Sequence, residues 1–209
     1  MERTKQRRRS VLITAAVCSW MLMAGKVYGE DPLLLDAIQA EGIERVTWRV
    51  EFANDCFFKK DNQVSNGWSL QKHSAVATDW ATMECSEFVK HLGKKIPTLT
   101  KEGLVYRAAI AIDQVFQTPD DGSRSDLIKD DVPYVGALTV QASWSAFNDN
   151  EFRGLEITAG VVGPDSFAEQ TQDAVHTLIG QNKSEGWDNQ IENEPVFNLN
   201  YMRKYKILR

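Results

Sequence analysis

The sequence predicts an all-β, antiparallel fold, and three observations support this prediction. After residue 45 the apolar residues recur with a period of two, which is typical of strands. No segment in this region approaches the 18 apolar residues that a membrane-spanning helix needs. Hydrophobic residues make up 43% of the 209 residues and charged residues 25%, a composition that favours a folded chain over a disordered one.

The first 29 residues predict a secretory signal peptide. A basic segment, MERTKQRRRS, precedes the apolar segment VLITAAVCSWMLMA, and a small residue, Gly29, marks the expected cleavage site. An uncleaved anchor is the alternative, although 14 apolar residues are short for a membrane span. We therefore expect an exported chain with one β domain over residues 30–209.

The net charge of −5 hides an asymmetry, because six of the 24 basic residues lie in the predicted signal peptide. Residues 30–209 carry 18 basic and 28 acidic residues. A nucleic-acid-binding protein needs a basic face, so this composition argues against one.

Six segments have the alternation of strands. In residues 135–147, for example, Val140 and Trp144 share an apolar face, whereas Thr139 and Gln141 share a polar one. The pattern fits a membrane strand between lipid and a wet interior, and it fits a strand of a soluble sandwich equally well. The predicted strands are residues 46–54, 66–76, 104–116, 135–147, 152–162 and 195–207.

One helix is predicted over residues 166–179, after Gly163-Pro164-Asp165 and before Gly180, and a weaker one over residues 84–93. Antiparallel alternation places the connections 55–65, 117–134 and 163–194 at one end of the sheet, and 77–103 and 148–151 at the other. Cys56 and Cys85 then lie at opposite ends, so we expect no disulfide between them, although exported cysteines usually pair.

Few residues are candidates for proton transfer or for metal binding. His176 follows Gln172 by four positions, so both lie on one helix face, and a neutral imidazole there can accept a proton from water. The alternative is an ordinary surface histidine. Asn54-Asp55 ends the first strand, where the pair either forms a turn or supplies oxygen ligands to calcium.

Several longer motifs resemble one family, from about residue 47 to the C-terminus. They are VEFANDCFF, VSNGWSL, DDVPYVGAL, ITAGVVGPDSFAEQTQDAVHTLIG and GWDNQIENEPVFNLNY. These motifs resemble the outer-membrane lipid A 3′-O-deacylases, the LpxR-like family. The resemblance implies a twelve-stranded outer-membrane β-barrel in a Gram-negative cell, which removes the 3′ acyloxyacyl chain of lipid A with the help of Ca²⁺.

The resemblance also implies site residues. The histidine base corresponds to His176, the glutamine one turn earlier to Gln172, and the small hydroxyl residue to Ser65. Asn54 and Asp55 correspond to the family's Asn-Asp pair and are the expected calcium ligands; Asp55 alternatively orients the imidazole. A lysine that would meet a lipid A phosphate corresponds to Lys129 or Arg124.

Six strands match the N-terminal half of such a barrel, with one short helix in an outer loop. We therefore expect a truncated or incomplete sheet, which self-association could close. The alternative function is a non-catalytic outer-membrane or periplasmic β protein of the same ancestry. The aromatic residues Trp68, Trp144, Tyr106 and Tyr134 are either interfacial residues or ordinary strand packing.

Overall fold

The computed structural model describes residues 45–54 and 66–207. From Val46 on, these residues belong to the second of the two compact units into which the chain divides. The predicted signal peptide at residues 1–29, together with Asp55, Cys56 and Ser65, lies outside the described residues.

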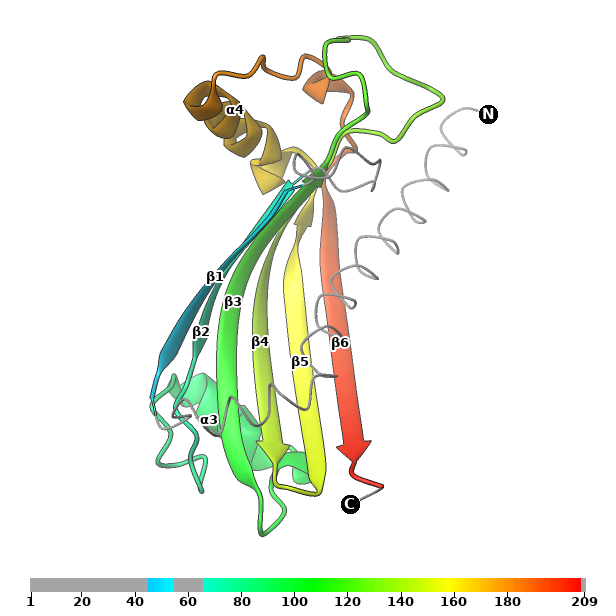
Figure 1. Ribbon diagram of the computed structural model, residues 1–209. Helices are drawn as coiled ribbons and strands as arrows, with labels where there is room; N and C mark the ends of the chain where they lie inside the picture. Colours follow the sequence, from blue (N-terminus) through cyan, green and yellow to red (C-terminus); the bar gives the residue numbers. More distant parts are fainter. Residues whose placement is uncertain (1–44, 55–65, 208–209) are drawn as a thin grey trace, which may run out of the picture. The chain divides into compact units, whose positions relative to one another are not determined.

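Six strands form one antiparallel sheet in which each strand pairs with the next one along the chain (Figure 1). The predicted strands agree with the observed ones to within three residues at every end. The all-β, antiparallel prediction is therefore confirmed. The strands are β1 (Thr47–Asn54), β2 (Asn66–His73), β3 (Val105–Gln117), β4 (Val135–Phe147), β5 (Glu151–Val162) and β6 (Glu194–Tyr205).

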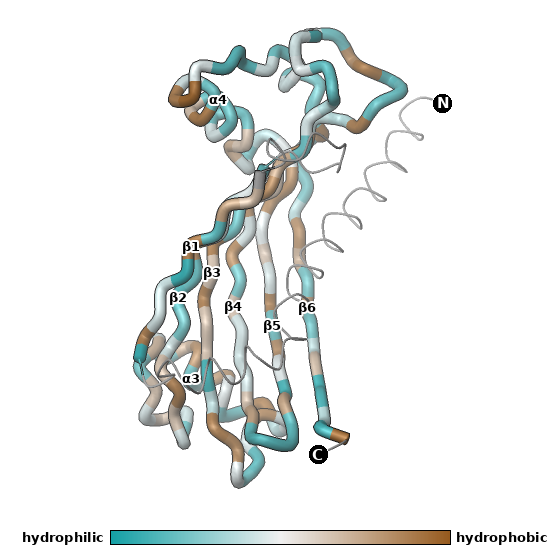
Figure 2. Tube along the Cα trace, in the orientation of Figure 1, coloured by the Kyte–Doolittle hydropathy of each residue, from teal (hydrophilic) through white to brown (hydrophobic). Residues whose placement is uncertain are grey.

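The register gives the sheet an apolar face and a polar face. One cross-strand row joins Val50, Leu70, Ile112, Val140, Ala159 and Phe197. Side chains on this apolar face are widely exposed, and Phe197 reaches 71%. The neighbouring row joins Glu51, Ser69, Asp113, Thr139 and Gly160 on the polar face. Figure 2 shows the resulting alternation of hydropathy along the strands.

Helix α3 (Glu87–Lys95) and the 3₁₀ turn η2 (Pro97–Leu99) lie between β2 and β3 and cover one end of the apolar face. Ser86 caps α3 by accepting a hydrogen bond from the N–H of Val89. The indole N–H of Trp144 on β4 donates to the carbonyl oxygen of Val89 over 2.9 Å. Gly93 is required here, because a Cβ atom at this position would lie 2.5 Å from the ring of Trp80.

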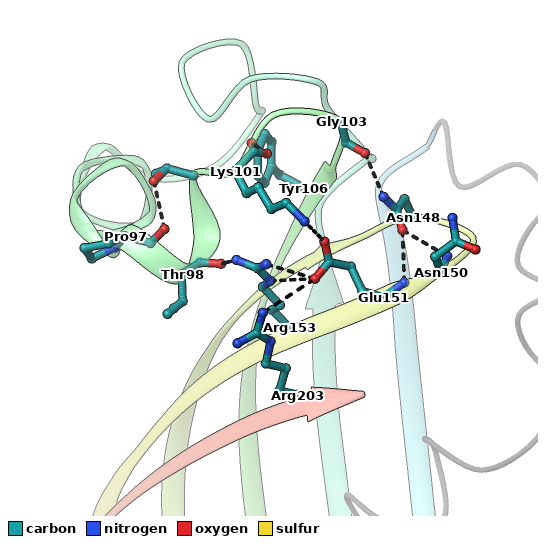
Figure 3. A network of polar contacts seen from close by, with 11 residues as sticks. Pro97, Thr98, Lys101, Gly103, Tyr106, Asn148, Asn150, Glu151, Arg153 and Arg203 are labelled. Atoms are coloured by element: carbon teal, nitrogen blue, oxygen red, sulfur yellow. Dashed lines mark hydrogen bonds and ion pairs between the residues drawn. The ribbon is translucent and has the colours of Figure 1, made fainter. Parts of the chain in front are cut away.

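A buried ion network fastens η2 to the sheet at the same end (Figure 3). The carboxylate of Glu151 accepts hydrogen bonds from Lys101 and from two nitrogens of Arg153, at 2.9 and 3.1 Å. Arg153 also donates to the carbonyl oxygen of Thr98 over 2.9 Å, and Arg203 lies 4.0 Å from Glu151. This network therefore joins η2, β5 and β6.

The opposite end of the sheet carries the 3₁₀ turn η3 (Pro164–Ser166), helix α4 (Ala168–Ile179) and the 3₁₀ turn η4 (Trp187–Asn189). The predicted helix exists but begins at Ala168 instead of residue 166. Its start is shifted because Phe167 adopts a left-handed conformation, with φ 57°, after the 3₁₀ turn. Gly180 ends α4 with φ 71°, as the sequence predicted.

The structure distinguishes between two interpretations of the aromatic residues. Tyr106, Tyr134 and Trp144 are buried, so the interfacial interpretation is wrong for these three and they are packing residues. Cys85 is a free thiol. The prediction that it forms no disulfide with Cys56 stays a prediction, because Cys56 lies outside the described residues. Within the described residues, no helix is both long enough and apolar enough to cross a membrane.

Candidate active site

The predicted site residues that the structure describes lie at the α4 end of the sheet. Strands β1, β3 and β5 all run towards this end, which brings Asn54, the β3–β4 connection and α4 together (Figure 1). Gln172 and His176 lie on α4, while Arg124 and Lys129 lie on the β3–β4 connection. Asp55 and Ser65 belong to the segment that is not described.

His176 has its ring held in one orientation. Its Nδ1 atom lies 2.6 Å from the main-chain carbonyl oxygen of Asn182. Since a carbonyl oxygen can only accept, Nδ1 must carry the hydrogen, and in the neutral imidazole Nε2 is then the acceptor. A neutral imidazole with an accepting Nε2 is the form that a general base requires.

The end of α4 creates this contact. Gly180 adopts the left-handed conformation, and its N–H and that of Gln181 both donate to the carbonyl oxygen of His176. The chain thereby reverses within six residues and returns the carbonyl of Asn182 to the ring. Lys183 then pairs with Asp173 on α4 at 2.6 Å and holds the reversed segment against the helix.

Gln172 is buried and fixes a neighbouring element. Its Oε1 atom accepts a hydrogen bond from the indole N–H of Trp187 over 2.8 Å. The Trp187 ring packs on Tyr134 and Phe116, with centroids 5.0 and 6.2 Å apart. Sequence reasoning assigned no role to Trp187, although the GWDNQ motif that contains it was a usable signal.

The β3–β4 connection is joined to the segment that follows α4. The N–H of Glu185 donates to the carbonyl oxygen of Gly122, and the Asn189 side chain donates to that of Ser125, both over 2.9 Å. The connection that carries both basic candidates therefore lies beside the segment that orients His176.

Arg124 is engaged by a neighbouring carboxylate. Its guanidinium makes two hydrogen bonds to Asp126, at 2.9 and 2.5 Å. This contact holds the pKa of Asp126 below its ordinary value. Lys129 is exposed on the same connection, and both side chains stay within reach of solvent.

Exposed apolar side chains lie on α4 and just before it. Leu178 and Ile179 in the last turn of α4 are 85% and 57% exposed, and Phe167 just before the helix is 58% exposed. A helix that carries a base and exposed apolar groups can contact an amphiphilic substrate.

The calcium prediction rests on residues at the end of β1. The register places Asn54 opposite Asn66, whose side-chain oxygen accepts a hydrogen bond from the N–H of Gly67. Amide and carboxylate oxygens are the ligands that Ca²⁺ prefers, so the residue types fit this ion. Among the described residues, no group of three or more His, Cys, Asp or Glu side chains could hold a metal.

Comparison with known proteins identifies relatives. The model of the family described as "Outer membrane protein LpxR" matches residues 13–209. The solved structure of "LpxR from Salmonella typhimurium" is similar at 16% sequence identity, with a TM-score of 0.55 over 74% of this chain. The match covers 49% of the solved chain, so this chain spans about half of its length. The search of curated proteins gave no match.

Proposed function

The chain belongs to the outer membrane protein LpxR family, and from this premise we propose that it hydrolyses the ester at the 3′ position of lipid A. The observation that carries the proposal is the tautomer of His176, because the Asn182 carbonyl leaves Nε2 as the proton acceptor. The exposed Leu178 and Ile179 in the last turn of the same helix suit a substrate with acyl chains.

In the proposed reaction, Nε2 of His176 removes a proton from a water molecule as the water oxygen attacks the ester carbonyl carbon. The tetrahedral intermediate then expels the sugar oxygen, which takes the proton back from the imidazolium. The products are a free 3′-hydroxyl group and an acyloxyacyl acid. The Asn182 carbonyl also stabilises the imidazolium, because its contact with Nδ1 strengthens when the ring is charged.

This contact bears on the two roles considered for Asp55. The imidazole already has an orienting acceptor in the Asn182 carbonyl, which favours a metal-binding role for Asp55 over a His-Asp dyad. Asn54 and Asp55 would hold Ca²⁺, which when bound supplies positive charge near the developing oxyanion. Ser65 and Gln172 would position the substrate or the ion, with Gln172 acting through Trp187.

A basic side chain would meet a lipid A phosphate. Arg124 is already paired with Asp126, so a phosphate would have to compete with that carboxylate. Lys129 lies on the same exposed connection, so both residues are candidates for the contact with a phosphate.

Closure of the sheet by a second copy is a further part of the proposal. Strands β1 and β6 end the strand order and run in opposite directions, so β6 of one copy could pair with β1 of another. Light scattering of the detergent-solubilised chain would distinguish a dimer from a monomer.

The test is mass spectrometry of lipid A from a Gram-negative host that expresses the full chain. We expect the chain to remove the 3′ acyloxyacyl mass, and His176→Ala to abolish this change. His91→Ala is the matched control, because His91 is an exposed histidine on α3 at the other end of the sheet. Addition of a calcium chelator to the purified chain should stop hydrolysis, and excess calcium should restore it.

An unchanged lipid A profile, with the protein located in the outer membrane, would overturn the proposed reaction. The alternative of a non-catalytic family member would then hold. Equal activity of the His176→Ala variant would instead show that another residue is the base.

A further inference from the structure

Helix α3 covers the apolar face with one side and leaves its other side exposed. Val89 and Gly93 are buried against the sheet and the loop before the helix. Outside this buried stripe Phe88 is 66% exposed, and Lys94 and Lys95 are exposed as well. Lys90 is paired with Glu87 at 2.9 Å, so the cationic character of the outer side comes from the last turn.

The packing under α3 is continuous with the apolar face. Leu155 and Ile157 of β5 and Ala142 of β4 are partly buried against the cluster that contains Val89 and Trp144. The next positions in the same rows, Ile110 and Leu199, are exposed. Helix α3 therefore lies at the border of the surface that faces lipid in an outer-membrane strand protein.

Exposed aromatic residues mark the same border on the flanking strands. Trp48 on β1, and Tyr201 and Tyr205 on β6, are at least half exposed on the apolar face. Lys72 lies 5.5 Å above the Trp48 ring, and Arg203 lies 4.8 Å from the Tyr205 ring. Tryptophan and tyrosine with adjacent cations are typical of the boundary between hydrocarbon and headgroups.

From this geometry we propose that α3 is an interfacial helix that rests on anionic phospholipid at the membrane surface opposite α4. Phe88 enters the boundary of the acyl chains, while Lys94 and Lys95 contact lipid phosphates. The proposal rests on membership of the outer-membrane family and not on the deacylase reaction, and its tests measure no lipid A chemistry.

The first test labels the full chain at a single cysteine with an environment-sensitive fluorophore, after Cys18, Cys56 and Cys85 are changed to Ser. The labelled variants are Phe88→Cys, Phe197→Cys on the apolar face and Asp149→Cys in the exposed β4–β5 turn. They are reconstituted in vesicles of phosphatidylcholine with phosphatidylglycerol that carry nitroxides at the headgroup or deep in the acyl chains.

We expect the headgroup nitroxide to quench the label at residue 88 more than the deep one, and the deep nitroxide to quench the label at residue 197 more. The label at residue 149 should have the emission of a water-exposed probe. The proposal is overturned if residue 88 behaves like residue 149 while residue 197 reports lipid. It is also overturned if residue 88 is shielded from water but unquenched by either lipid, because a protein would then cover the helix.

The second test changes the charge of the last turn in the Phe88→Cys background. Lys94→Glu with Lys95→Glu should reduce the phosphatidylglycerol-dependent part of the quenching severalfold, whereas Lys94→Arg with Lys95→Arg should retain it. Equal quenching of both variants would contradict the proposed contact with anionic lipid. Added salt should weaken the quenching of the Arg variant towards that of the Glu variant.

Discussion

The two ends of the sheet are held by different kinds of interaction. At the α3 end Glu151 and Arg153 form an ion pair whose side chains are only 6% and 8% exposed. At the α4 end Arg124 and Asp126 form a pair of similar geometry whose side chains are 46% and 65% exposed. Surface pairs contribute little to stability, whereas removal of one partner from a buried pair is costly.

The same contrast appears in the hydrogen bonds of the tryptophans. Trp80 and Trp144 at the α3 end donate to main-chain carbonyl oxygens of Leu99 and Val89. Trp187 at the α4 end donates to the side chain of Gln172, a residue of the candidate site. The tryptophan hydrogen bonds at the α3 end therefore stabilise the fold. At the α4 end the hydrogen bond of Trp187 joins a buried side chain to a residue of the candidate site.

The largest expected effect on stability is the loss of Trp144 at the α3 end. Trp144→Ala removes a side chain that is 1% exposed and leaves a cavity under α3, at a cost of about 3–5 kcal/mol in the free energy of unfolding. Urea unfolding of the reconstituted chain, followed by fluorescence, measures this change. A loss below about 1 kcal/mol would show that α3 is not an anchor.

Trp144→Phe is the matched control for this substitution. It keeps most of the ring volume and removes the hydrogen bond to Val89, so it should cost about 1 kcal/mol. If both variants lose equal stability, the hydrogen bond and not the packing would hold α3.

The second comparison uses two carboxylates. Glu151→Gln should lower the unfolding midpoint, because Lys101 and Arg153 lose the negative charge that they share. Asp126→Asn should lower the midpoint much less, because its pair with Arg124 is exposed. An equal shift in both variants would remove the distinction between the two ends.

The pH dependence of the exposed pair has a definite sign. The Arg124 contact lowers the pKa of Asp126, so its small contribution to stability is present above the ordinary aspartate pKa of about 3.9. This contribution is lost as the pH falls through the lowered value. The difference in stability between the parent chain and Asp126→Asn should therefore vanish only in acid.

Much of the sheet could be predicted from the sequence. Residues 135–147 alternate cleanly, and the predicted strand has the bounds of β4. Strand β2 ends at His73, three residues before the prediction, because the Ser74 side chain accepts from the N–H of Ala108 and the next bridge to β3 forms only at Ala77, opposite Tyr106. Such a contact across 34 positions leaves no local signal.

The site could be predicted only in part. The spacing of Gln172 and His176 placed both on α4, but it gave no indication that Gln172 binds Trp187 or that Asn182 orients the imidazole. Every residue has a main-chain carbonyl group, so the sequence does not indicate which carbonyl oxygen binds the imidazole. The left-handed Phe167 was equally hidden, because this conformation is unusual for a bulky residue.

The next prediction concerns the coupling between packing and chemistry at the α4 end. Gln172→Leu leaves the buried indole N–H of Trp187 without its acceptor, which should cost about 1–3 kcal/mol. We expect a larger loss in kcat than in KM, because η4 and the segment that orients His176 belong to one connection. The measurement is kinetics on a purified lipid A substrate, together with urea unfolding.

Trp187→Phe sharpens this prediction, because it removes the donor and keeps an aromatic ring. If Gln172 acts only through Trp187, the double variant should lose no more activity than Gln172→Leu alone. Additive losses would indicate that Gln172 also contacts substrate or metal.

A small effect on stability is expected from two glycines in left-handed conformations, one at each end. Gly180 has φ 71° and Gly103 has φ 76°, and neither has an atom within 4 Å of the position of an added Cβ. Gly180→Ala and Gly103→Ala should therefore cost a similar amount, about 1 kcal/mol, from backbone strain alone. Only Gly180→Ala should also reduce kcat, because the turn at Gly180 carries the Asn182 carbonyl back to Nδ1 of His176. If kcat falls equally in both variants, backbone strain in general would explain the loss, and the orientation of the His176 imidazole would not.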